Sequence, residues 1–198
     1  SCRPPHSPPA HPWHDAGSPP GVRPLRTLLC LFAALAAPPL AAATFQVDSV
    51  TDAPDLDPGD GLCRTAAGDC SLRAAIQQAN ATPGFDTVQV PEGGYLLNLD
   101  GADGEDAAAR GDLDIREPMA LIGTAAAGSA MGVQITGARF ASGSHGDRLI
   151  DIDTGSLQVP VRIEHVMISF GDSAEPRGGG GLLLRTGSAL ALRDVMFY

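Results

Sequence analysis

The segment VRIEHVMI at residues 161–168 returns 29 positions later as LALRDVMF at residues 190–197. A second pair precedes it, IDIDTGS at residues 150–156 and LLLRTGS at residues 182–188, offset by 32 positions. Repeats of about 30 residues with short apolar strands, glycine turns and no second helix are typical of a β-solenoid. A β-sandwich would instead need hairpin turns at short, regular spacing. We therefore predict a mainly β chain folded as a parallel β-helix.

The alternation within these strands predicts which side chains point into the coil, namely Ile150, Ile152, Leu182 and Leu184. The residues between them should point outward. Aligning the Thr-Gly-Ser turns places Asp153 directly beneath Arg185, since both precede the threonine. We expect these two side chains to form an exposed ion pair, and Asp151, beneath Leu183, to have no such partner.

A short helix is predicted from CSLRAAIQQAN at residues 70–80, where Leu72, Ala75, Ile76 and Ala79 follow helical spacing. Ser71 is the expected helix cap, and the Pro-Gly pair at residues 83–84 ends the helix. A helix of this length is not stable alone. We expect it to cover the open end of the first β coil.

Residues 70–76 resemble the Cys-Ser-Leu-Arg-Glu-Ala-Ile motif of the CSLREA domain, which is found in bacterial secreted proteins. The similarity extends to residues 45–49, 58–63 and 111–115, and Ala74 stands where the motif has glutamate. A glutamate there would complete a capping box with Ser71. The resemblance implies a right-handed parallel β-helix, and it implies no common activity.

The first part of the chain is predicted to be an export signal. Residues 1–22 are rich in proline and histidine and are expected to be disordered. Residues 23–43 combine Arg23 and Arg26, an apolar run and a triple alanine, which indicates a signal peptide cleaved after Ala43. We expect residues 44–100 to form the N-terminal cap and residues 101–198 the first coils of a truncated β-helix. The protein should be secreted or displayed at the cell surface.

Export implies an oxidising compartment, in which Cys63 and Cys70 are expected to form a disulfide. Between the predicted first strand and this pair lies a loop with four acidic residues spaced along Gly and Pro, namely Asp52, Asp55, Asp57 and Asp60. Such a loop is either a Ca²⁺ site or an Asx-rich turn, because both use closely spaced aspartates. No other cofactor is expected.

The composition limits the partners. The chain has 13 arginines and no lysine, and from residue 44 onward 10 arginines stand against 22 acidic residues. This acidity disfavours nucleic acid and anionic membranes as partners. We expect no membrane insertion after signal cleavage.

Two functional classes remain. The favoured one is an adhesin-like interaction scaffold that binds a surface glycan or protein. The alternative is a polysaccharide-active lyase or hydrolase of the pectate-lyase-like kind, because paired carboxylates carry glycoside chemistry. Two sequence pairs place carboxylates on one outward face, Asp112 with Asp114 and Asp151 with Asp153. Of these, Asp151 and Asp153 are the candidate catalytic residues.

Overall fold

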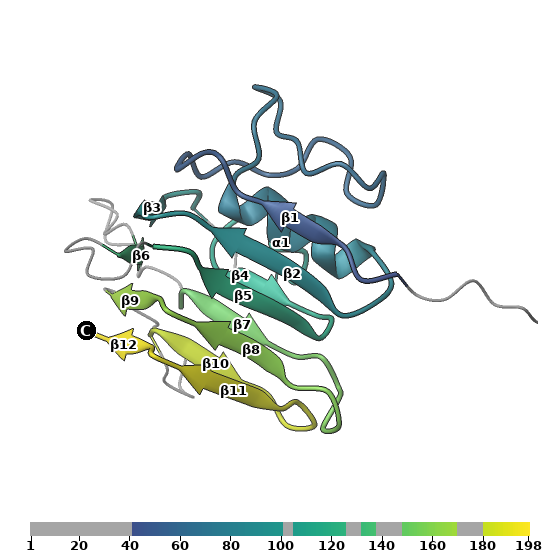
Figure 1. The fold of residues 1–198 in the computed structure, drawn as a ribbon, viewed down its shortest axis with the longest axis vertical. Coiled ribbons are helices and arrows are strands. Elements are labelled where there is room, and N and C mark those ends of the chain that lie inside the picture. The colour runs from purple at the N-terminus through teal and green to yellow at the C-terminus, as the bar shows by residue number, and fades with distance from the viewer. Residues whose placement is uncertain (1–40, 101–104, 126–131, 138–147, 170–179) are drawn as a thin grey trace, which may run out of the picture. The chain divides into compact units, whose positions relative to one another are not determined.

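The described strands follow one another around three parallel sheets, so that each coil adds one strand to each sheet (Figure 1). The computed structural model describes residues 41–100, 105–125, 132–137, 148–169 and 180–198. The predicted disordered segment and the signal peptide up to residue 40 lie outside these ranges.

Within each coil the chain enters the three sheets in turn. The first sheet contains β1 (Thr44–Gln46), β2 (Asp86–Val90), β5 (Met119–Gly123), β8 (Val161–Glu164) and β11 (Leu190–Arg193). The second contains β3 (Gly93–Leu97), β6 (Val133–Gly137), β9 (Met167–Ser169) and β12 (Met196–Phe197). The third contains β4 (Leu113–Ile115), β7 (Ile150–Ile152) and β10 (Leu182–Leu184).

The register confirms the repeat. Val161 of β8 pairs with Leu190 of β11, which is the offset of 29 found in the sequence. Ile150 of β7 pairs with Leu182 of β10, the offset of 32. All the strand pairs between these elements are parallel. The predicted β-solenoid with one short helix is therefore the fold of the described residues.

The coils begin earlier than the predicted cap suggests. β2 and β3 are separated by a two-residue corner and do not pair with each other, because they belong to different sheets. Each pairs instead with a strand of the next coil, β2 with β5 and β3 with β6. Residues 44–100 thus contain the first strands of the solenoid as well as the cap.

The core consists of apolar side chains stacked from coil to coil. In the first sheet the register aligns Phe45, Val88, Leu121, Ile163 and Leu192. The first four are buried, whereas Leu192 is 46% exposed. Among the described residues no strand pairs with the outer edge of β11, and this edge position accounts for the exposure.

The inward positions of the third sheet follow the same trend. Ile150 and Ile152 are fully buried, as their inward alternation predicts. Leu182 is partly buried against the core, and Leu184, stacked on Ile152 at the sheet edge, is 42% exposed.

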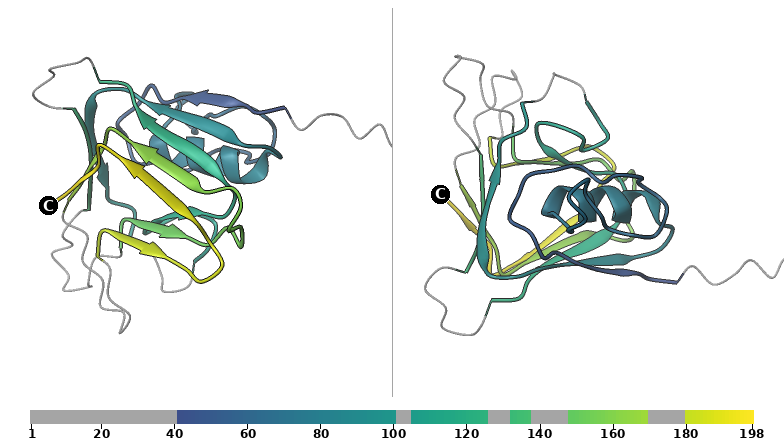
Figure 2. Two further views of the ribbon diagram at one scale, coloured as in Figure 1. Left: turned by 60° about the horizontal axis from the view of Figure 1, so that its bottom comes forward. Right: turned by 90° about the horizontal axis from the view of Figure 1, so that it is seen from above.

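The helix α1 (Leu72–Ala81) lies across the end of the coils, beside β1, β2 and β4 (Figure 2). Its four predicted apolar residues are all buried. Ser71 is the N-cap, and its hydroxyl accepts a hydrogen bond from the Ala74 N–H at 3.0 Å. No helix among the described residues has the length and apolar character needed to cross a membrane.

The position of Ile76 gives a test of this arrangement. Its side chain lies on the buried face of α1 and is fully buried, so Ile76→Asp should lower the free energy of unfolding by at least about 3 kcal/mol. Leu96→Asp is the matched control, because Leu96 on β3 is 46% exposed and should cost less than about 1 kcal/mol. Urea titration measures both, and equal losses would contradict the capping role of the helix.

Candidate functional site

Three carboxylates gather on the outer face of the third sheet. Asp114 of β4 and Asp151 of β7 are direct neighbours in the register, and Asp112 lies just before β4. Oxygens of the three groups lie within 4.8 Å of one another, and all three residues are buried. The sequence correctly placed these residues on outward positions, but it gave no reason to expect their burial.

Arginine side chains cover this carboxylate cluster of Asp112, Asp114 and Asp151. Arg148 places Nη1 3.3 Å from Asp151 and Nε 3.6 Å from Asp112. Arg116 places Nη2 2.6 Å from Asp114. With Arg185 on Asp151, each of the three carboxylates has a guanidinium partner, and Arg116 is shared with Asp106 and Asp153.

This pairing of charges bears on metal binding. A divalent cation is held by oxygen ligands that carry uncompensated negative charge. Here each carboxylate already has an arginine nitrogen within 3.6 Å. The cluster is therefore better suited to joining the coils than to holding an ion.

The expected partner of Arg185 was wrong. The backbone register is as predicted, because the Arg185 N–H bonds the carbonyl of Ile152 and so follows the Leu184–Ile152 pair. The side chain, however, reaches diagonally to Asp151, with Nε 2.8 Å from Oδ1. Diagonal neighbours on a sheet lie within reach of long side chains. Asp153 instead lies 3.6 Å from Arg116 and keeps 44% of its side chain exposed.

The expectation that Asp151 lacks a partner was also wrong. Its side chain is only 2% exposed and is shared by Arg185 and Arg148. Leu183, its stacking neighbour on β10, is half-buried and apolar, which favours ion pairing beside it. The Asp151 carboxylate in turn raises the pKa of the Arg185 guanidinium.

A loop at residues 105–111 closes over Asp114. The Glu105 carboxylate accepts hydrogen bonds from the backbone N–H groups of Ala107, Ala109 and Arg110, which shapes the loop. The Ala108 N–H then donates to Asp114 Oδ2 at 3.0 Å. Burial raises the pKa of Asp114 to about 7, although the Ala108 N–H and the Arg116 charge act to lower it.

The helix holds this loop through three polar side chains that the sequence analysis missed. Arg73 donates from Nη1 to the Ala108 carbonyl at 3.0 Å, and Gln77 donates to the Ala107 carbonyl at 3.1 Å. Asn80 donates to the Asp114 carbonyl at 2.7 Å. Their spacing of four and three residues puts them on one helix face. This row of polar side chains on one helix face was the sequence feature that could have revealed their contacts with the loop.

The aspartates of the candidate calcium loop bond mainly to the protein itself. Asp52 forms a buried ion pair with Arg73 at 2.6 Å and also accepts the N–H groups of Asn98 and Leu99. Asp55 accepts the Asp57 and Arg64 N–H groups.

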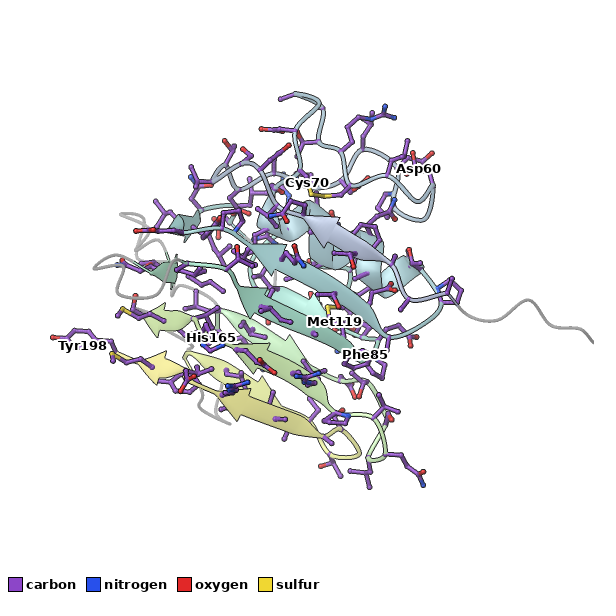
Figure 3. All side chains as sticks on the ribbon, viewed as in Figure 1. Asp60, Cys70, Phe85, Met119, His165 and Tyr198 are labelled. Carbon is purple, nitrogen blue, oxygen red and sulfur yellow. A yellow bond between two sulfur atoms is a disulfide. The ribbon has the colours of Figure 1, made fainter. Side chains whose placement is uncertain are left out.

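The remaining two aspartates lie on the exposed part of the loop. Asp60 accepts hydrogen bonds from the Leu62 N–H and the Gln78 side-chain amide. Asp60 lies at the outside of the loop (Figure 3), and Asp57 is also exposed. In the described part of the chain, no three carboxylates of this loop converge as those of the cluster do. Its geometry is that of Asx turns, and calcium binding stays a prediction that these contacts do not favour.

Cys63 and Cys70 form the expected disulfide, with their Cα atoms 5.2 Å apart (Figure 3). It joins the aspartate loop to the residue before the helix cap.

The two candidate catalytic residues, Asp151 and Asp153, lie in different surroundings. Asp151 lies buried under two arginines, whereas Asp153 is accessible, so they do not form an open carboxylate pair.

Removing the Arg185 side chain should destabilise the fold, because the buried Asp151 carboxylate then loses one of its two arginine partners. We expect Arg185→Ala to lower the free energy of unfolding by about 1–3 kcal/mol, because Asp151 then keeps only Arg148. The control is Arg193→Ala, whose side chain is 69% exposed and lies 3.9 Å from Glu164; it should cost at most about 0.5 kcal/mol. Urea unfolding of both variants decides, and indistinguishable losses would contradict the buried pair.

The raised pKa of Asp114 predicts a pH dependence. Between about pH 4 and 7 the folded state binds this proton and the unfolded chain does not, so stability should fall as pH rises, by at most about 1.4 kcal/mol per pH unit. Asp114→Asn should flatten the slope, whereas Asp106→Asn, at an exposed partner of Arg116, should keep it. The measurement is urea unfolding across this range, and an unchanged slope in Asp114→Asn would contradict the assignment.

Comparison of the chain with protein-family models, curated proteins and solved structures gives no match.

Proposed function

We propose that this chain is an exported, CSLREA-type β-solenoid that acts as an interaction scaffold at or outside the cell surface. The motif at residues 70–76 supports the family, since its serine caps the helix and its arginine is buried beneath it. The Cys63–Cys70 disulfide supports an oxidising compartment. The apolar segment and triple alanine at residues 23–43 supply the proposed export signal.

The scaffold role is supported mainly by the carboxylate cluster, in which every carboxylate is paired with an arginine. A glycoside hydrolase needs two carboxylates that reach the substrate, one to donate a proton and one to attack or to activate water. Asp112, Asp114 and Asp151 are buried, and each pairs with an arginine. Their arrangement favours joining adjacent coils into a stiff rod over bond cleavage.

The outer face of the second sheet is the surface best suited to a partner. Its outward positions in the register are uncharged throughout. The accessible ones are Gly94, Leu96, Gln134, Thr136, Met167 and Met196, while Ser169 is buried beside Thr136. The formal charge of the chain is −10, so an uncharged row of this length is distinctive. A partner protein or neutral glycan docks on such a face without desolvating charge.

The scaffold role is tested on exported protein with two parallel assays. Incubation with acidic and neutral polysaccharides should release no new reducing ends or unsaturated products. Binding to producing cells or their isolated glycans, measured by co-sedimentation, should fall at least about tenfold in Leu96→Arg, because a charge then faces the partner. Gln89→Arg, on the first sheet, is the control and should bind normally.

The enzyme alternative makes the opposite prediction. Polysaccharide cleavage that Asp153→Asn abolishes, with an unchanged melting temperature, would replace the scaffold by a catalyst. Binding that is equally weak in Leu96→Arg and Gln89→Arg would remove the second sheet as the docking face.

A further inference from the structure

A buried carboxylate outside the cluster is only half satisfied. Asp86, the first residue of β2, is 0% exposed. Its Oδ1 accepts a hydrogen bond from the Ala43 N–H at 2.7 Å. Its Oδ2 is buried and has no hydrogen-bond partner among the described residues. A buried charge in this state is costly unless a cation lies beside it.

Ala43 is the first of the described residues that packs against the core. Its side chain packs partly buried against the core, and its carbonyl accepts the Thr87 N–H at 2.9 Å. Ala41 and Ala42 are exposed and pass over Gly84, where a Cβ would come within 3.2 Å of the Ala41 oxygen. Ala41 and Ala42 are thus not part of the core, while Ala43 itself completes the start of the first sheet.

An α-ammonium at Ala43 would supply what Asp86 lacks. The same nitrogen that now donates one neutral N–H would carry a positive charge and further donors within reach of the carboxylate. Charge-assisted bonds of this kind are shorter and roughly twice as strong as neutral ones. A chain whose first residue is Ala43 would therefore give the Asp86 carboxylate the charged partner that it lacks among the described residues.

We propose that export processing hydrolyses the Ala42–Ala43 peptide bond and that the new N-terminal ammonium forms a buried ion pair with Asp86. In this step a peptidase of the exporting cell adds water across the bond. The Ala42 carbonyl carbon takes the hydroxyl, and the Ala43 nitrogen takes the proton and leaves as an amine that is protonated at neutral pH. The inference rests on the proposed export.

The position of the cut differs by one residue from the sequence expectation. Cleavage after Ala43 would follow the Ala-x-Ala pattern at residues 41–43. It would also remove both the nitrogen that faces Asp86 and the carbonyl that binds the Thr87 N–H. Cleavage after Ala42 keeps a small residue before the cut and retains both contacts.

Residues 43–198 contain no lysine, which makes the test direct, because the new α-amine is the only primary amine of a chain made of these residues. Intact mass and N-terminal sequencing of the exported protein should give Ala43 as the first residue. An amine-reactive ester should then label the native protein about tenfold more slowly than the urea-unfolded protein, since the ammonium is paired and enclosed.

A variant pair separates the ion pair from general protection. Asp86→Asn should restore fast labelling and lower the melting temperature, whereas Asp57→Asn, at an exposed loop position, should change neither. A first residue of Thr44, or native labelling as fast as unfolded labelling, would overturn this inference and leave export standing. Recovery of the chain with residues 23–43 attached would overturn both.

Discussion

The buried ion pair between Arg73 and Asp52 connects the capping helix to two loops that no sheet hydrogen bond holds in place. The guanidinium is 0% exposed, and all five of its N–H donors are used. Two reach the Asp52 carboxylate, and three reach the carbonyls of Ala108, Gly111 and Asp112. A single side chain of the helix thereby fixes the loop before the disulfide and the loop over the carboxylate cluster.

This arrangement explains how a ten-residue helix can end a solenoid. One face supplies apolar cover for the first coil, while Arg73, Gln77 and Asn80 bond the loop side, and Gln78 bonds Asp60 and the Leu62 carbonyl. Backbone groups that would otherwise be buried without partners are satisfied by the helix side chains. The cap therefore works by hydrogen bonding as much as by hydrophobic contact.

The sequence was sufficient for the repeat, the register and the inward residues, because stacking in a solenoid constrains positions that alternate with period two. It was insufficient for Asp151, whose outward position suggested solvent. Its burial comes from Arg148, three residues before it, and from Arg185 and Leu183 on the next coil. The cover over Asp114 depends in the same way on Glu105 and on the helix, so no local pattern could reveal it.

The lack of lysine has a structural consequence. Arg116 touches both Asp114 and Asp153, and Arg148 touches both Asp112 and Asp151, so each arginine joins residues of two coils. The planar guanidinium fork allows this double pairing, whereas a lysine ammonium is a compact point charge. The acidic residues of this face are then counter-ions of the framework, and the uncharged second sheet is the face on which we propose that a partner docks.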